Sequence, residues 1–201
     1  MSTDTTEGLI DVPGAKLFYK SRGSGPVLLT LQGGAGDADG SDDLADALAD
    51  RYTVVAYDRR GLSRSTAGDP AQPPGIAVHS DDASRLLSAL TSQPAFVFGA
   101  SIGALIGLDL AAAHPEQVRL LLAHEAAVAS LLDEPGRSQM QALHDDVDDT
   151  FRRVGLLPTM RKLLAIAGGV RPRPRTRDPA GDARRGTRRP AHREHAVLPG
   201  P

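Results

Sequence analysis

Residues 94–115 constrain the fold of this chain more strongly than any other part of its sequence. An apolar run of strand length, Ala95–Phe98, is followed closely by an apolar run of helix length, Ile102–Ala113. Between them stands Gly99-Ala100-Ser101-Ile102-Gly103, which has the pattern G-x-S-x-G. A strand, a tight turn and a helix in this order predict that Ser101 is held at the top of the strand in a strained conformation, as an exposed nucleophile.

The two outer glycines of this motif have a steric explanation. We expect a side chain at Gly99 or Gly103 to clash with the neighbouring strand or helix. The alternative is an ordinary strand–turn–helix in which Ser101 only caps the helix. A bare G-x-S-x-G arises often by chance, but the strand and helix around this one favour the nucleophile.

The composition indicates one globular protein with a single core. The chain has 201 residues, of which 40% are apolar and 24% charged, and this length can bury one good core. The absence of cysteine excludes disulfides, a thiol nucleophile and a thiolate metal site. No apolar run is long enough to span a bilayer, and residues 1–11 are too acidic and polar for a signal peptide. We therefore expect a cytoplasmic protein without a membrane partner.

Strand-like and helix-like segments alternate along the chain. Two strands, Leu9–Val12 and Ala15–Lys20, are expected around the turn Pro13-Gly14. After them the expected order is strand, helix, strand, helix, strand, helix, strand, at Val27–Leu31, Asp42–Asp50, Tyr52–Tyr57, His79–Leu90, Ala95–Phe98, Ile102–Ala113 and Val118–Ala123. We place Asp81 and Asp82 in the first turn of the His79–Leu90 helix. The alternation predicts an α/β fold with a mostly parallel, doubly wound sheet and helices on both faces.

The unusual turns all follow predicted strands. They are Gln32–Gly36, Asp58–Ser65, Gly99–Gly103 and His124-Glu125, at the carboxyl edge where ligands bind in such sheets. A phosphate-binding loop is the disfavoured alternative for the glycines of the first turn, because neither G-x-G-x-x-G nor G-x-x-x-x-G-K-[ST] is present. Asp58 and the arginines after it are able to bind an anionic substrate, but a structural turn is the favoured interpretation.

Four segments, in this order, resemble the α/β-hydrolase superfamily: VLLTLQGGAG, VVAYDRRGLSRS, FVFGASIGALIGLDLAAAHP and VRLLLAHE. The resemblance covers about Leu9–Glu125 and, loosely, the segment to Ala167, where a family cap would begin. It implies that Ser101 is the nucleophile and that the backbone N–H groups of Gly34 and Ile102 form the oxyanion hole. Two such donors matter because negative charge develops on oxygen in the tetrahedral intermediate.

The sequence departs from the family pattern beside the first donor. Gln32 stands where many members have His, and Ala35 where many have Pro. Neither change removes a backbone N–H, so the expected oxyanion hole is unaffected.

The acid and base of the triad are harder to find. In this family the order is Ser, then Asp or Glu, then His after an eighth strand, and no seventh or eighth strand is evident here. None of the histidines (His79, His114, His124, His144, His192 and His195) occupies that place. Glu125 is the best available acid, because some members place theirs after the sixth strand. His124 and Glu125 are neighbours on a strand end, so we expect their side chains to diverge and to form a polar rim instead.

The carboxyl-terminal third changes character. Helices are expected at Gly136–Arg153 and Leu157–Ala167, which divides the chain into a core (1–130), a partial helical cap (131–168) and an Arg/Pro-rich tail (169–201). Residues 171–201 hold nine Arg and three acidic residues, a charge of +6, against −8 for residues 1–170.

The tail has two explanations. It is a disordered basic segment that binds nucleic acid or an acidic partner, or it is the product of a shifted reading frame. We favour the second, because out-of-frame translation of GC-rich coding sequence tends to yield Arg, Pro, Gly and Ala. The chain is then a family member that is truncated or frameshifted after about residue 167, and a nucleic-acid partner is not expected.

These observations predict a serine hydrolase acting on a small-molecule ester, amide or related acyl compound, without metal or organic cofactor. Missing strands would leave the sixth strand as an exposed edge that favours self-association, and a missing base would make turnover low or absent. The alternatives are a non-catalytic binding protein on the same scaffold, using the basic tail, and a cofactor-free haloperoxidase-like enzyme.

Overall fold

The computed structural model describes residues 4–34, 36–67 and 74–168. It consists of two compact units, residues 1–138 and 139–201, and each is described by itself. The sheet and the helices packed on it belong to the first unit. The Arg/Pro-rich tail lies outside the described residues, so both explanations for it stay hypotheses.

Within the described ranges, six strands form one sheet in the spatial order β1-β2-β4-β3-β5-β6. They are β1 (Thr5–Val12), β2 (Ala15–Arg22), β3 (Val27–Leu31), β4 (Thr53–Tyr57), β5 (Ala95–Ala100) and β6 (Val118–His124). β1, β2 and β4 pair antiparallel, whereas β4, β3, β5 and β6 run parallel to one another. The predicted mostly parallel α/β sheet is therefore confirmed.

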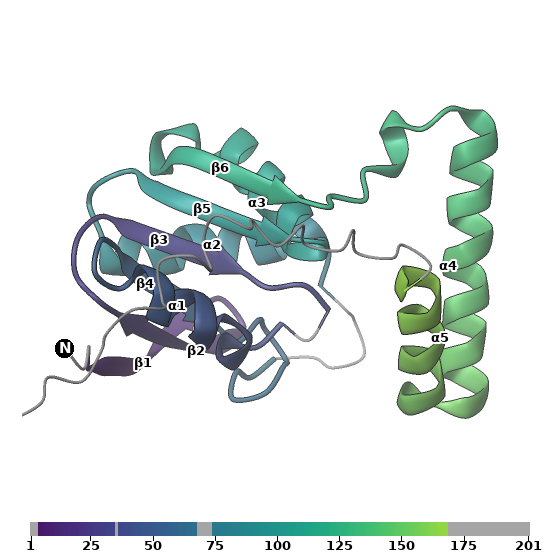
Figure 1. Cartoon of the computed structure of the whole chain (residues 1–201), viewed down its shortest axis with the longest axis horizontal. Coiled ribbons are helices and arrows are strands. Elements are labelled where there is room, and N and C mark those ends of the chain that lie inside the picture. The colour runs from purple at the N-terminus through teal and green to yellow at the C-terminus, as the bar shows by residue number, and fades with distance from the viewer. Residues whose placement is uncertain (1–3, 35, 68–73, 169–201) are drawn as a thin grey trace, which may run out of the picture. The chain divides into compact units, whose positions relative to one another are not determined.

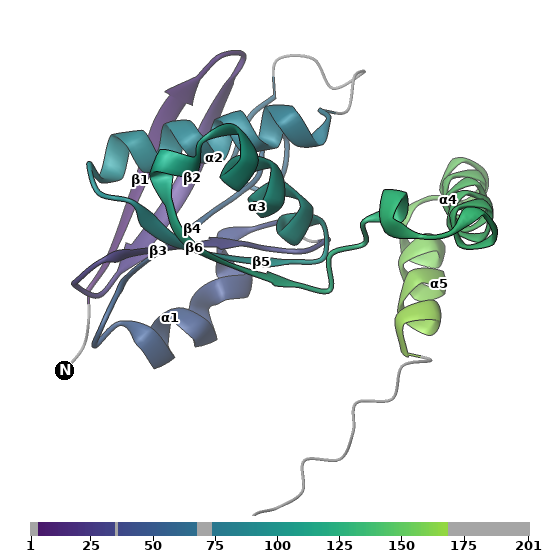
Figure 2. The ribbon, with the colours of Figure 1, turned by 90° about the horizontal axis from the view of Figure 1, so that it is seen from above.

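Helices cover both faces of this sheet, as Figure 2 shows. α1 (Asp42–Leu48) lies on one face, and α2 (Ile76–Leu90) and α3 (Ile102–Ala113) lie on the other (Figure 1). The larger core cluster packs beneath α2 and α3, and a smaller one beneath α1. Successive residues of β3 contribute to opposite clusters, Leu29 to the larger and Leu28 to the smaller. A strand covered on both faces has no solvent side, which explains its continuous apolar sequence.

Most predicted boundaries agree with the structure, but the starts of β1 and α2 were predicted wrongly. β1 begins at Thr5, four residues before the predicted Leu9. α2 begins at Ile76 after the extended residue Gly75, three residues before the predicted start. Asp81 and Asp82 consequently lie beyond the first turn, where a carboxylate gains little from the helix dipole. Among the described residues of the first unit there are also three short 3₁₀ turns, at Ala38–Ser41, Pro115–Gln117 and Ala129–Leu131.

The first half of α2 carries polar side chains into the protein interior. The carboxylate of Asp82 is fully buried and accepts two hydrogen bonds from Arg60, 2.9 Å from Nε and 2.6 Å from Nη2. This bidentate pair ties the loop after β4 to α2.

His79, one turn earlier in α2, is 7% exposed, and its Nδ1 has no hydrogen-bond partner among the described residues. Burial lowers the pKa of its ring; the charges of Arg59 and Arg60 lower it further, and that of Asp82 opposes them. The folded protein therefore favours the neutral ring.

Two further helices follow the sheet, α4 (Glu134–Val154) and α5 (Leu156–Gly168). The boundary between the compact units falls within α4, between Ser138 and Gln139. Lys162 of α5 donates to the hydroxyl of Thr150 on α4 at 2.9 Å and pairs with Asp146. Across the described ranges, no helix combines the length and apolar character needed to cross a membrane. The partial cap predicted for residues 131–168 stays a prediction.

In the described part of the chain, β6 is paired on one side only, with β5. Leu120 and Leu122 of this strand are 48% and 60% exposed. Such an edge offers unpaired backbone groups and apolar side chains to another strand.

We propose that this 201-residue chain self-associates through β6, and we expect Leu122→Lys to lower its mass in solution. A lysine on an edge strand opposes strand pairing, because its charge would be buried in the joined sheet. Light scattering after size exclusion measures the mass. Leu9→Lys on β1, at the opposite edge, is the control, and dissociation by Leu9→Lys instead would place the contact on β1.

We also expect the free energy of unfolding to decrease as the pH is lowered, because of His79. Its folded pKa lies below its unfolded value, so below about pH 6.5 the unfolded chain binds a proton that the folded one does not. The stabilisation is complete above that pH and is lost as the pH falls, by at most about 1.4 kcal/mol per pH unit. Urea unfolding measures the free energy of unfolding at pH 7.5 and at pH 5.5. The difference between these two free energies should be smaller for His79→Gln than for the parent or for His114→Gln. An unchanged difference in His79→Gln would contradict this assignment.

Candidate functional site

Ser101 stands alone between the last residue of β5 and the first residue of α3. Its backbone has φ 54° and ψ −120°, a conformation that a residue with a side chain adopts only under strain. Its side chain is exposed and makes no capping hydrogen bond to the described residues. The interpretation of Ser101 as a helix-capping serine is therefore wrong, and its hydroxyl is left accessible.

Three backbone hydrogen bonds hold the turn. The N–H of Ser101 donates to the carbonyl of His124 on β6 at 2.9 Å, and its own carbonyl accepts from Ala104 N at 2.9 Å and from Leu105 N at 3.3 Å. Hydrogen bonds to β6 and to α3 thus fix the strained residue, so the surrounding fold maintains the strain.

The predicted roles of Gly99 and Gly103 are confirmed. A Cβ at Gly103 would overlap the carbonyl group of Leu31 in β3, and a Cβ at Gly99 would overlap the backbone of Gly103. α3 therefore approaches the sheet at a distance that only glycine permits.

The glycine-rich loop after β3 lies beside Ser101. A Cβ added at Gly33 would stand 3.5 Å from the Cβ of Ser101, whereas one added at Gly34 would meet nothing within 4 Å. The N–H of Ile102 belongs to the first turn of α3, where helix geometry provides no intrahelical acceptor. Ser101, the Gly33-Gly34 loop and the start of α3 thus meet at one point.

The loop after β4 is a structural turn, as favoured from the sequence. Asp58 is fully buried and accepts hydrogen bonds from Ala38 N, Arg64 N and the Arg64 guanidinium at 2.7–2.9 Å. Burial alone would raise the pKa of its carboxyl, but the Arg64 guanidinium and the two N–H groups bring that pKa below its usual value. Arg60 is occupied by Asp82, so neither Arg60 nor Arg64 is free to bind an anionic substrate.

Arg59 differs from Arg60 and Arg64 because its side chain donates to backbone carbonyl oxygens instead of to a carboxylate. Its Nη2 donates to the carbonyl oxygens of Gly33 at 2.9 Å and Gly34 at 3.2 Å. Its backbone N–H donates to Gly36 O at 2.8 Å. The side chain that holds the glycine-rich loop was not identified from the sequence, because three arginines stand within six residues and nothing in the pattern distinguishes them.

Glu125 follows β6, and the expectation that its side chain diverges from that of His124 is wrong. Glu125 has φ 53°, which breaks the alternation of a strand. Its Oε2 consequently lies 4.0 Å from Nδ1 of His124, within range of a charge interaction but beyond hydrogen-bond distance. Both side chains are largely exposed.

The other described histidines lie elsewhere. His79 is buried in α2, His114 follows the far end of α3, and His144 belongs to the second compact unit. In the described ranges no group of three His, Asp or Glu side chains could hold a metal ion. The absence of a cofactor stays a prediction.

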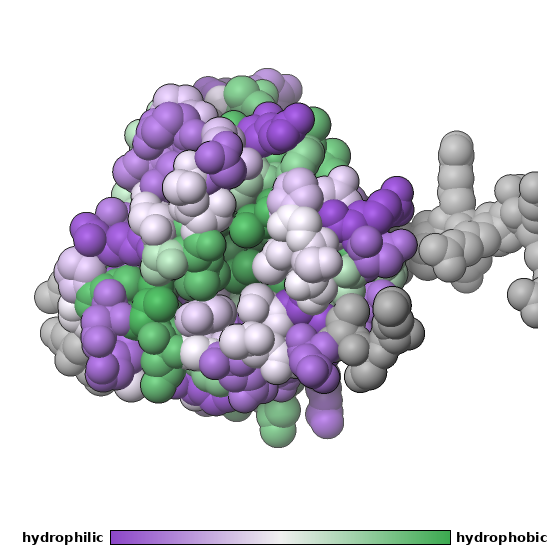
Figure 3. All heavy atoms as spheres, turned by 90° about the vertical axis from the view of Figure 1, so that its left-hand side faces the viewer, coloured by the Kyte–Doolittle hydropathy of each residue, from purple (hydrophilic) through white to green (hydrophobic). Residues whose placement is uncertain are grey.

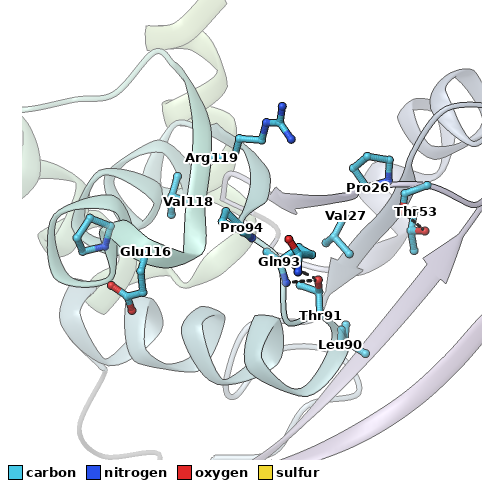
Figure 4. Close-up of a pocket in the computed structure, with 12 residues that line it drawn as sticks. Pro26, Val27, Thr53, Leu90, Thr91, Gln93, Pro94, Glu116, Val118 and Arg119 are labelled. Carbon is cyan, nitrogen blue, oxygen red and sulfur yellow. Dashed lines mark hydrogen bonds between the residues drawn. The ribbon is translucent and has the colours of Figure 1, made fainter.

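A cavity of about 760 Å³ lies at the opposite end of the strands from Ser101. Its lining comes from the amino-terminal ends of the strands and the segments before them, including Val27, Thr53, Pro94 and Val118 (Figure 4). Figure 3 looks onto the side of the molecule where β3 begins, and green apolar surface lies in the middle of that side. β5 alone separates the cavity from Ser101 by roughly 15–20 Å, so this cavity does not contain the candidate site.

The sequence model of the alpha/beta hydrolase fold family matches residues 26–194. Uncharacterized hydrolase YraK of Bacillus subtilis (strain 168) is 46% identical over 145 residues, which are 72% of this chain and 54% of YraK. The chain thus spans about half the length of this curated relative.

Solved structures of other proteins also resemble this chain. E-2-(acetamidomethylene)succinate hydrolase is 28% identical with a TM-score of 0.55, over 60% of this chain and 44% of that one. The thioesterase domain from the curacin biosynthetic pathway is 24% identical with a TM-score of 0.59, over 71% of this chain and 51% of that one, and shows the fold alone. By the family match and the fold together, this chain belongs to the alpha/beta hydrolase fold family.

Proposed function

We propose that this chain is a serine hydrolase that cleaves a small-molecule ester, amide or related acyl compound, with Ser101 Oγ as the nucleophile. The conformation of Ser101 carries this proposal. Ser101 is strained, exposed and without a capping bond, and backbone hydrogen bonds to β6 and α3 hold it there. Such strain costs stability on the order of 1–3 kcal/mol. A fold that needed only a turn here would relax that strain.

The reaction proceeds in two steps. Ser101 Oγ attacks the acyl carbon while its proton passes to a base, and the carbonyl π electrons move onto oxygen. The tetrahedral intermediate collapses as the leaving group departs with its bonding electrons and gains a proton. Water then attacks the Ser101 ester in the same way, releasing the acid and restoring the hydroxyl.

The backbone N–H groups of Gly34 and Ile102 are the proposed oxyanion donors. Ile102 N–H is free of an intrahelical acceptor by its place in α3, and the loop of Gly33 and Gly34 borders Ser101. The open space beside Gly34 is where a substrate carbonyl can approach. Loss of one such donor typically costs on the order of 100- to 1000-fold in rate.

Glu125 is the candidate acid. It directly follows β6, whose last residue, His124, accepts a backbone hydrogen bond from Ser101. Its neighbour His124 is largely exposed and lies beyond hydrogen-bond distance of it, so we assign His124 to the polar rim of the site. A serine without an oriented base acylates slowly. We therefore propose that turnover of this chain is low although the hydroxyl of Ser101 is accessible.

Relatives support the class of substrate without identifying it. One solved relative is named as a hydrolase of E-2-(acetamidomethylene)succinate, and this name applies to that protein. Hydrolysis of a small molecule is also what Ser101 and the proposed oxyanion donors fit. Fold alone does not choose among such reactions.

We expect Ser101→Ala to abolish labelling by an alkyl fluorophosphonate, because the probe phosphonylates an accessible serine oxygen and releases fluoride. Mass spectrometry of the intact chain measures the adduct. Ser63→Ala is the matched control, since Ser63 is also exposed and also has a positive φ, of 48°. Absence of an adduct on the folded parent, or a persisting adduct in Ser101→Ala, would contradict the assignment and favour a non-catalytic binding protein.

We expect His124→Ala to change the rate of this labelling by less than about threefold, since a rim residue does not take the serine proton. The rate is followed between pH 5.5 and 8.5, with His114→Ala at the far end of α3 as the control. A loss of about 100-fold, together with loss of the pH dependence, would show that His124 is the general base.

A further inference from the structure

Arg59 lies directly beneath the glycine-rich loop and is almost completely enclosed. The residue is 6% exposed, and one nitrogen, Nη2, donates to both Gly33 O and Gly34 O. Gly36, with φ 62°, passes so close to the guanidinium that a Cβ there would lie 2.5 Å from Nε and Nη2. The loop is therefore wrapped around this side chain.

The contact with Gly33 O determines the direction of the neighbouring N–H. The carbonyl of Gly33 and the N–H of Gly34 belong to one planar trans amide and point in opposite directions. Because Arg59 holds the carbonyl, the N–H of Gly34 faces away from Arg59. The same hydrogen bond polarises the amide, which makes its N–H a stronger donor.

The charge of Arg59 is not neutralised by a carboxylate in the described part of the chain. Arg60 is paired with Asp82, and Arg64 with Asp58 and Asp39. Nε and Nη1 of Arg59, by contrast, have no hydrogen-bond partner among the described residues. Of the three arginines of this loop, Arg59 is thus the one whose positive field is not cancelled at close range.

A buried guanidinium with unpartnered N–H groups destabilises a fold, and an apolar side chain of similar size would fill the same space at lower cost. A structural support for the loop does not require a charge. An uncancelled charge beside the oxyanion donor is useful only when negative charge develops there.

We propose that Arg59 is a positioning residue of the oxyanion hole: it fixes the Gly33–Gly34 amide so that Gly34 N–H is presented to the oxyanion, and its charge polarises that amide. This inference rests on the proposed function of Ser101. It adds a side chain from the loop after β4 to a site otherwise built from β3, β5 and α3.

The first part of the test measures the loop itself and does not depend on turnover. We expect ¹⁵N relaxation of the Gly33, Gly34 and Gly36 amides to give order parameters near 0.85 in the parent and below about 0.6 in Arg59→Met. Arg59→Lys keeps the charge but lacks the planar fork, so its values should lie between these. Arg85→Met removes an exposed positive charge on α2 that contacts none of these glycines, and should leave them ordered.

The second part measures reaction of Ser101 with the fluorophosphonate, whose phosphoryl oxygen would accept from the same donors. We expect the maximal inactivation rate of Arg59→Met to fall by about tenfold or more, and the half-saturating probe concentration to change less than about threefold. Arg59→Lys should recover part of the rate. A side chain that only supported the fold would lower the folded fraction and leave the rate per folded molecule unchanged.

Ordered glycine amides in a folded Arg59→Met chain would overturn the inference, and so would loosened glycines with an unchanged rate. If Arg59→Met does not fold, Arg59→Lys decides by the same two measurements. If the parent chain is not labelled at all, the proposed function of Ser101 fails, and the order parameters alone decide whether Arg59 positions the loop.

Discussion

The contact between α3 and β3 is the constraint on which the rest of this structure depends. At Gly103 the helix backbone meets the carbonyl of Leu31 so closely that no side chain fits, and Gly99 clears the other side of the same turn. This approach places the first turn of α3 beside the loop that leaves β3. It also leaves Ser101 no room for a relaxed turn, because its N–H is bonded to β6 and its carbonyl to α3. Strain at Ser101 and closeness to the glycine-rich loop therefore have one cause.

Charged groups fix the surrounding loops in two ways: some arginines pair with carboxylates, and one donates to backbone carbonyls. In the pairs Arg64–Asp58 and Arg60–Asp82, a fully buried carboxylate accepts from a guanidinium, and these pairs join the loop after β4 to its neighbours. Breaking such a pair leaves a buried charge unpaired, which typically costs about 3–5 kcal/mol. Arg59 instead uses its guanidinium on backbone carbonyls, where the geometry of one amide determines what the other side of the loop presents. Neighbouring arginines of one loop thus serve the fold and the site separately.

Much of this fold could be predicted because its signals are local. α3 has the predicted bounds, since glycine precedes it and proline follows it, and β3 is recognisable as a short apolar run between turn residues. The start of α2 was missed because Gly75 precedes it without a side-chain cap, and the sequence just before it is rich in proline and glycine, which is typical of a loop. The relation of His124 to Glu125 was predicted wrongly because a positive φ at a non-glycine residue cannot be read from sequence. Arg59 was missed because its role depends on a carbonyl more than twenty residues away.

The two ends of the parallel strands differ in a way that bears on where function lies. The cavity of about 760 Å³ is at the amino ends, yet the three non-glycine residues with positive φ in the described ranges, Ser63, Ser101 and Glu125, follow β4, β5 and β6 at the carboxyl ends. Empty volume beside a sheet needs no special conformation, whereas each strained residue costs on the order of 1–3 kcal/mol and persists only where the surrounding structure enforces it. Hydrogen bonds enforce it at Ser101, between β6 and α3. The backbone strain, which gathers at the carboxyl ends, therefore supports the proposed site at Ser101, and the position of the cavity does not argue against it.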